Sequence, residues 1–160
     1  MKAVEIDRAL MMGIYDLATT NERQRTSDPR LKLDLSVTYI AELLRDEGNS
    51  AIISSEGGKE GRGLAIYHWT RSRRAVTCNV SLLLSAGDGH GRALNDHLVA
   101  ETSRRKSEFK KKAAYICLSS LPGAVGFYKN LGYEVAGATD KQGCRTNAAS
   151  TVERLRRLLK

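Results

Sequence analysis

The stretch SAGDGHGRAL, residues 85–94, places three glycines within five positions and leads directly into a run of good helix formers. Glycine loses more conformational freedom on folding than any other residue, so such a cluster marks an unusual backbone bend or a close approach. The run before it, AVTCNVSLLL (75–84), favours a strand. A strand, a glycine-rich turn and a helix together build an anion site, because backbone amides point outward and the helix dipole favours negative charge.

Two familiar phosphate-binding motifs do not fit this loop. A Walker A loop ends in Gly-Lys-Ser/Thr, whereas Gly91 is followed here by Arg92 and Ala93. A dinucleotide fingerprint needs a third glycine that is missing from both possible frames, and the strands before the loop look antiparallel. The loop therefore belongs to another kind of anion site.

The size and composition indicate one globular domain over residues 1–160. Hydrophobic residues make up 41% of the 160 residues, which is enough to form a core. No apolar run reaches the ~20 residues that span a membrane, and the first residues lack a secretory cleavage site, so we expect a cytoplasmic protein. The three cysteines are widely spaced without a C-x-x-C pair, which argues against a disulfide framework and against a zinc site.

The net charge of +8 favours anionic partners. Basic clusters such as RSRR (71–74) and RRKSEFKKK (104–112) carry few interleaved aromatic residues and no nucleic-acid motif, which argues against nucleic-acid binding. Solvated helix faces explain most of this charge. An acidic protein partner is the next interpretation.

Hydrophobic periodicity predicts a mixed α/β order of elements. We expect helices near 7–19 and 37–49, and then an antiparallel meander of strands at 50–55, 64–70 and 75–84. A long helix from 91 to about 112 should bury Ala93, Leu94, His97 and Leu98, with Thr102 on the same face. A strand at 113–120, a short helix at 122–132, a strand at 133–137 and a basic C-terminal helix at 149–160 complete the prediction.

Two stretches resemble the signatures of the GNAT superfamily of N-acetyltransferases. GDGHGRALNDHLV (87–99) resembles its acetyl-CoA loop, R/Q-x-x-G-x-G/A after the fourth strand, with Gly89 and Gly91 at the glycine positions. AVGFYKNLGYEV (124–135) resembles its A-x-x-h-Y-x-k-h-G-F/Y element, with Tyr128 and Gly132 at marked positions. The order of the two signatures, and the helix and strand between them, strengthen the resemblance.

The resemblance implies a GNAT-like fold, with a mostly antiparallel mixed sheet, flanking helices and acetyl-CoA as cofactor. It implies direct acetyl transfer to an amine with no metal, and Tyr128 as the general acid that returns a proton to the departing thiolate. The pantetheine arm would pair with the backbone of the family's fourth strand, which is here the end of the predicted strand 75–84. The pyrophosphate would lie on the loop amides, and a serine would stand beside the family's asparagine position. The cofactor-binding residues so implied are Leu82, Leu83, Leu84, Gly87, Asp88, Gly89, His90, Gly91, Arg92 and Ser119.

The chain departs from the family pattern at several positions. Ala86 occupies the R/Q position, and no Asp or Glu occurs between Arg71 and Ala86 to serve as a base. A base could instead be His68, His90 or a water held by Asn79. Two functions therefore stay open: an N-acetyltransferase acting on a small-molecule or protein amine, and an acetyltransferase-fold protein with weak or no catalysis that binds a partner through its basic surface.

Overall fold

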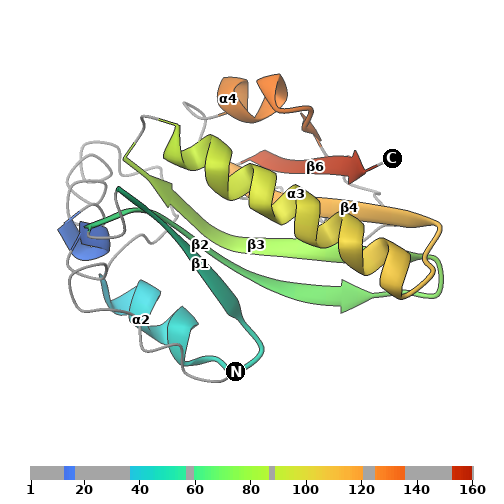
Figure 1. Cartoon of the computed structure of the whole chain (residues 1–160), viewed down its shortest axis with the longest axis horizontal. Helices are drawn as coiled ribbons and strands as arrows, with labels where there is room; N and C mark the ends of the chain where they lie inside the picture. Colours follow the sequence, from blue (N-terminus) through green and yellow to red (C-terminus); the bar gives the residue numbers. More distant parts are fainter. Residues whose placement is uncertain are drawn as a thin grey trace. The chain divides into compact units, whose positions relative to one another are not determined.

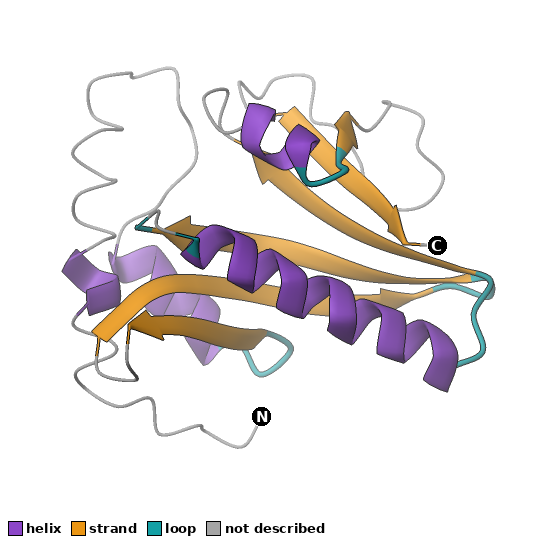
Figure 2. Cartoon of the chain, turned by 45° about the horizontal axis from the view of Figure 1, so that its top comes forward, coloured by secondary structure: helices purple, strands orange, loops and turns teal. Residues whose placement is uncertain are grey.

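The computed structural model describes residues 13–16, 37–56, 60–86, 89–120, 125–135 and 153–159. Residues 13–16 are helical, as expected there. The remaining elements are α2 (Val37–Arg45), β1 (Ser50–Glu56), β2 (Glu60–Arg71), β3 (Ala75–Ser85), α3 (His90–Glu108), β4 (Ala113–Ser120), α4 (Val125–Asn130), β5 (Glu134–Val135) and β6 (Glu153–Leu159) (Figures 1 and 2). The predicted mixed α/β class is confirmed.

The six strands form one sheet in the order β1-β2-β3-β4-β6-β5. β1 and β2 pair antiparallel, and β2 and β3, which three residues connect, run in opposite directions in Figure 1. β3 and β4 pair parallel, from Ala75 opposite Ala113 to Val80 opposite Leu118, and α3 makes the crossover between them. β4 with β6 and β5 with β6 are antiparallel, so the sheet is mixed and mostly antiparallel, as predicted.

The predicted C-terminal helix is wrong. The segment Glu153–Leu159 forms strand β6, which lies between β4 and β5 and pairs with β4 from Ser120 opposite Glu153 to Ala114 opposite Leu159. An isolated helix of this length is marginal in water, whereas the apolar strand β4 has backbone groups along that edge that need hydrogen-bond partners. Pairing with β4 and β5 satisfies them, and it also buries Leu159.

The described residues divide into two compact units. The first unit holds the described residues up to His68 together with Ser81–His97, and the second holds Trp69–Val80 and the described residues from Leu98 onward. The expectation of a single domain stays a prediction. Among the described residues, no helix is both long and apolar enough to cross a membrane.

The first unit buries the middle of β2, where Leu64, Ala65 and Ile66 are fully buried. Helix α2 ends close to its predicted stop: the side-chain amide of Asn49 donates to the Leu43 carbonyl (3.0 Å), and the Gly48 amide donates to Asp46 Oδ1 (2.9 Å). These two bonds satisfy polar groups at the helix end and lead the chain into β1.

Helix α3 buries a different face from the predicted one. Leu94, Leu98 and Thr102 are buried as expected, but Ala93 and His97 are exposed. Gly91 and Asn95 occupy the inner face instead. Positions 91, 95, 98 and 102 follow a spacing of three and four residues, which is the spacing of one helix face. His97 is therefore a surface residue and not the core histidine that the sequence suggested.

Two cysteines lie in the interior of the second unit. Cys78 on β3 is free, and burial raises the pKa of its thiol to about 12. Cys117 on β4 is also fully buried, but it is disulfide-bonded. The prediction from cysteine spacing, which argued against disulfides, is therefore wrong for Cys117.

Candidate functional site

The end of β3 leads the chain into the glycine loop. Leu82 and Leu84 are buried, whereas Leu83 between them is half-buried, which is the alternation of a strand with one face in the core. These three residues lie beyond the register that joins β3 to β4, which ends at Val80. The resemblance assigns the pantetheine arm to this part of the β3 backbone.

The loop closes onto α3 through Gly89. Its φ of +84° is a left-handed conformation that side chains rarely adopt, and a Cβ built there would meet nothing within 4 Å. The Gly89 carbonyl accepts the first helical hydrogen bond, from the Ala93 amide (2.9 Å). The sequence prediction of a glycine turn that opens a helix is confirmed, and the backbone at Gly89 is open to close approach. Gly87 and Asp88 lie outside the described residues.

The first turn of α3 presents the features of an anion site. Its amides at His90, Gly91 and Arg92 precede the first residue that can bond within the helix. The turn contains no acidic residue, and the Arg92 side chain is exposed. Together with the positive end of the helix dipole, these groups can hold a phosphate group.

Strand β2 sets the position of this helix end. A Cβ added at Gly63 would lie 2.9 Å from Leu94 Cδ1, 3.3 Å from the Leu84 carbonyl oxygen and 3.5 Å from His90 Cβ. The Ala86 amide donates to the Arg62 carbonyl (2.9 Å), so the start of the loop is also tied to β2. Gly63 lies between the predicted strands 50–55 and 64–70, so the sequence predicts a turn there. A glycine close to an apolar strand run can also mark close approach by another element, and that was the signal that could have identified it.

Three groups were offered as a base, and the structure describes two of them in detail. A hydrogen bond of 2.6 Å joins His90 Nδ1 to Ser54 Oγ on β1, which fixes the ring at the start of α3. Ser54 was not singled out from the sequence. In the second unit, the Asn79 side-chain amide donates to Thr70 Oγ1 (2.9 Å). His68 is half-buried on β2.

Tyr128 lies in the second unit, on α4, with only 7% of its surface exposed. Its ring packs edge-on against Phe127 and Tyr133, at centroid distances of 5.2 and 5.5 Å. Gly132, at φ +94°, lets the chain turn back so that the Tyr133 amide bonds to the Tyr128 carbonyl (3.1 Å). Burial raises the pKa of the Tyr128 phenol to about 12, so the phenol stays protonated at neutral pH and is able to donate a hydrogen bond.

The last predicted contact, Ser119, lies on β4 opposite Arg154 of β6. Its side chain is outside the described ones. The roles assigned to Ser119, to Tyr128 and to the loop residues stay predictions, because they need a ligand to test them.

The chain shares its fold with solved N-acetyltransferases, among them a member of the GNAT family. A solved Tetrahymena GCN5 matches with 14% identity over 96% of this chain and 90% of its own, at a TM-score of 0.64. A GNAT-family acetyltransferase from Staphylococcus aureus Mu50 matches with 14% identity over 98% of each chain, at a TM-score of 0.63. An aminoglycoside 6'-acetyltransferase type Ii matches with 15% identity over 97% of this chain and 93% of its own, at a TM-score of 0.62.

No protein-family model matches the sequence, and no curated protein matches it. The likeness to solved structures thus concerns the fold, and it confirms the fold that the two sequence signatures implied.

Proposed function

We propose that this protein is an acetyl-CoA-dependent N-acetyltransferase that moves an acetyl group directly to an amine. The observation that carries the proposal is the start of α3: a left-handed, unobstructed Gly89 is followed by helix amides with no acidic residue among them. In a GNAT fold, that helix end follows the strand to which the pantetheine arm is assigned.

The residues fit the cofactor in charge and shape. Amides of Gly89, His90, Gly91 and Arg92 would hold the pyrophosphate, and the Arg92 side chain would add a charge-assisted contact. The backbone of Leu82, Leu83 and Leu84 would pair with the pantetheine amides. A residue with a side chain at Gly89 would strain the turn, because its φ is positive, and the open backbone there supports a phosphate held by amides.

Acetyl-CoA would supply a thioester carbon for the amine nitrogen to attack. A carbon–nitrogen bond then forms, the carbon–sulfur bond breaks, and the amine proton passes to a base or to solvent. In this proposal the Tyr128 phenol donates to the departing thiolate. Because an ordinary thiol has a pKa near ~8.5, a phenol with a pKa of about 12 stabilises the thiolate chiefly as a hydrogen-bond donor.

The acceptor in this proposal is an amine on a small molecule or on a protein. Proteins of this fold are named for both kinds, an aminoglycoside 6'-acetyltransferase and an Escherichia coli ribosomal-protein-S18-alanine N-acetyltransferase. A second candidate is a protein of this fold with weak or no catalysis that binds a partner. It is favoured by Ala86, which has no side-chain donor and whose amide is bonded to Arg62, and by the absence of any carboxylate on β3.

The test is calorimetric titration of acetyl-CoA and CoA into the wild type, Arg92→Glu and Arg45→Glu. Arg92 and Arg45 are both exposed, so each substitution changes the net charge equally. An acidic residue at a helix N-terminus stabilises the helix, so Arg92→Glu should fold. We expect micromolar binding that weakens at least about tenfold in Arg92→Glu and less than about twofold in Arg45→Glu.

Two results would count against the proposal. Equal affinity of the wild type and Arg92→Glu for acetyl-CoA would show that the phosphate does not bind at this loop. The absence of any binding heat would show that the protein does not bind the cofactor. Release of CoA in the presence of a panel of amines then separates the two candidates. Binding without release in any reaction would favour the protein that has kept the fold but not the catalysis.

A further inference from the structure

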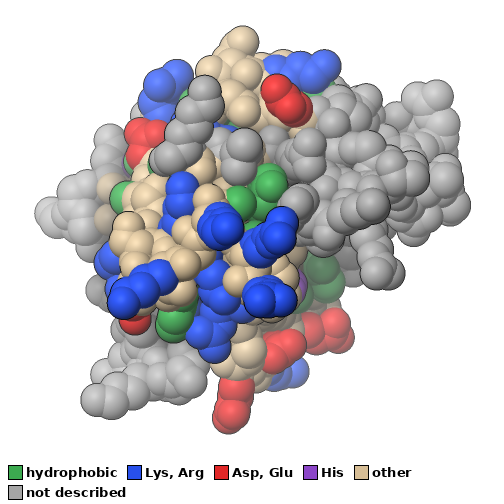
Figure 3. Space-filling model, turned by 90° about the vertical axis from the view of Figure 1, so that its right-hand side faces the viewer, with side chains coloured by type: hydrophobic (Ala, Val, Ile, Leu, Met, Phe, Trp, Pro, Cys, Tyr) green, Lys and Arg blue, Asp and Glu red, His purple; other side chains and the backbone are tan. Residues whose placement is uncertain are grey.

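A second anion site is suggested by a cationic pocket in the second unit. A cavity of about 270 Å³ is lined by Arg73 and Arg74, from the turn between β2 and β3, and by Lys110 and Lys112, from the turn between α3 and β4. All four residues are exposed. Figure 3 shows Lys and Arg side chains gathered on the face of the molecule that these turns occupy in Figure 1.

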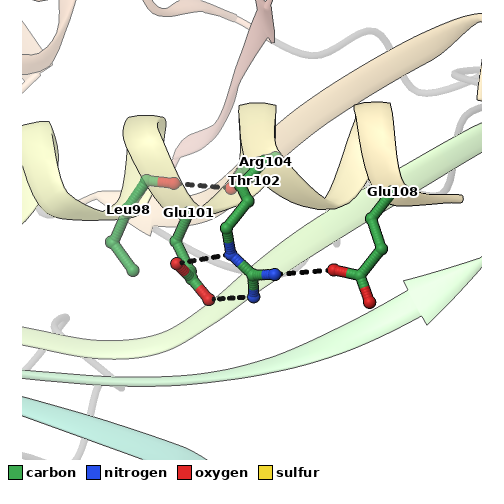
Figure 4. Close-up of polar contacts among 5 residues, drawn as sticks. All are labelled: Leu98, Glu101, Thr102, Arg104 and Glu108. Carbon is green, nitrogen blue, oxygen red and sulfur yellow. Dashed lines mark hydrogen bonds and ion pairs between the residues drawn. The ribbon is translucent and has the colours of Figure 1, made fainter.

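The charges of this pocket are not neutralised within the described part of the chain. There, no carboxylate forms an ion pair with any of the four lining residues. The acids nearest in sequence are engaged elsewhere on α3: Arg104 bonds both Glu101 and Glu108, each at 2.6 Å (Figure 4). Four like charges around one cavity repel one another, so binding of a multiply charged anion would offset this electrostatic repulsion.

The two turns are tied together, which holds the pocket walls in place. The Lys111 ammonium donates to the carbonyls of Ser72 (2.9 Å) and Arg73 (3.4 Å). The backbone amides of Lys112 and Ala113 both donate to the Arg74 carbonyl, at 2.9 and 3.1 Å. The lining side chains therefore project from a bonded backbone frame and not from two independent loops.

One wall of the pocket also carries backbone strain. Lys110 has a φ of +51°, and it is the described non-glycine residue with a positive φ. Non-glycine residues adopt this left-handed conformation rarely. Strained residues of this kind persist where the surroundings hold them, and they cluster at ligand clamps.

The aromatic rings of this unit help to decide between classes of anion. The guanidinium of Arg71 lies 4.3 Å from the centroid of the Phe109 ring, and that of Arg105 lies 4.3 Å from the centroid of the Trp69 ring. Both rings are half-buried, and each has a cation over one face. Nucleic-acid bases need open rings on which to stack.

We propose that Arg73, Arg74, Lys110 and Lys112 form a binding site for a compact phosphate group. Two arginine forks suit the oxygens of a phosphate dianion, and two lysines add point charges. The group would be carried by a phosphorylated segment of a partner protein or by a small free phosphate compound. This site belongs to a different unit from the glycine loop and does not depend on the proposed acetyl transfer.

The test compares a pocket variant with a matched control. Arg73→Gln/Lys112→Gln removes one arginine and one lysine from the pocket, and Arg45→Gln/Lys129→Gln removes the same pair from exposed sites on α2 and α4. Both variants lower the net charge from +8 to +6, because each loses two cations. The probes are inorganic pyrophosphate, a phosphoserine peptide with its unphosphorylated form, and a DNA duplex, each titrated calorimetrically.

We expect pyrophosphate or the phosphoserine peptide to bind the wild type. Its affinity should fall at least about tenfold in the pocket variant and less than about twofold in the control variant. Tighter binding of the peptide identifies a protein segment as the source of the phosphate, and tighter binding of pyrophosphate identifies a free compound. Equal losses in both variants, or binding that the pocket variant leaves unchanged, would overturn the proposal. So would a duplex that binds more tightly than either phosphate probe and depends on the pocket. Thermal unfolding of both variants checks that they fold.

Discussion

The packing at Gly63 predicts that Gly63→Ala destabilises the protein, although most Gly→Ala changes at compatible positions stabilise. A methyl group there would lie 2.9 Å from Leu94 Cδ1 and 3.3 Å from the backbone oxygen of Leu84. The Leu94 side chain is buried and the Leu84 oxygen belongs to β3, so neither can move freely. Overpacking of this kind costs about 1–3 kcal/mol. The reduced entropy of the unfolded chain returns about 0.4–1 kcal/mol, which leaves a net loss of about 1–2 kcal/mol.

Gly126→Ala is the matched control for this prediction, because it adds the same methyl group where there is room. Gly126 lies in α4, and a Cβ built there meets nothing within 4 Å. Alanine in place of a helical glycine should stabilise by about 0.5–1 kcal/mol. Urea unfolding measures both changes as shifts of the midpoint at constant slope. A Gly63→Ala protein as stable as the wild type, or two substitutions of the same sign, would refute the argument from close packing.

Two further predictions concern the second unit. The Tyr128 phenol has a pKa of about 12 in the folded protein and ~10 when unfolded, so the folded state keeps this proton to higher pH. Its contribution to the free energy of unfolding is complete below pH ~10 and falls by about 3 kcal/mol as the pH rises toward 12. Tyr128→Phe should therefore make the alkaline loss of stability shallower by one proton. Arg105→Gln should lose a cation–π contact worth about 0.5–1 kcal/mol and shift the fluorescence of Trp69, the single tryptophan. Arg104→Gln, which removes ion pairs on α3 but no contact with that ring, should leave the emission unchanged.

Most of the elements could be predicted from local patterns. The strand β4 was placed at its observed residues, 113–120, because its apolar run is bounded by a basic helix end and by a proline. The strand–glycine–helix order at the start of α3 was predicted because glycine spacing and strand-favouring residues are local signals. The inner face of α3 was predicted only in part. The apolar residues of this helix are weakly segregated to one face, so its packing against the sheet determines which residues are buried.

The candidate site shows the same division between local and long-range information. Gly89 could be identified from its neighbours in sequence, because a left-handed turn before a helix needs a glycine there. Ser54 could not be identified in this way. It lies 36 residues before its partner His90, and only the pairing of β1 with β2 and the packing of α3 bring the two together.

The sequence by itself determined the mixed α/β order and the glycine turn at the start of α3, because backbone conformational preferences act over a few residues. Only the tertiary structure decided that Glu153–Leu159 forms a strand and not a helix. Its leucines, at positions 155, 158 and 159, follow the spacing of one helix face, so the local pattern by itself predicts a helix. The strand state wins because the edge of β4 offers a row of unpaired backbone groups, and pairing along that edge outweighs a short helix that nothing else would stabilise.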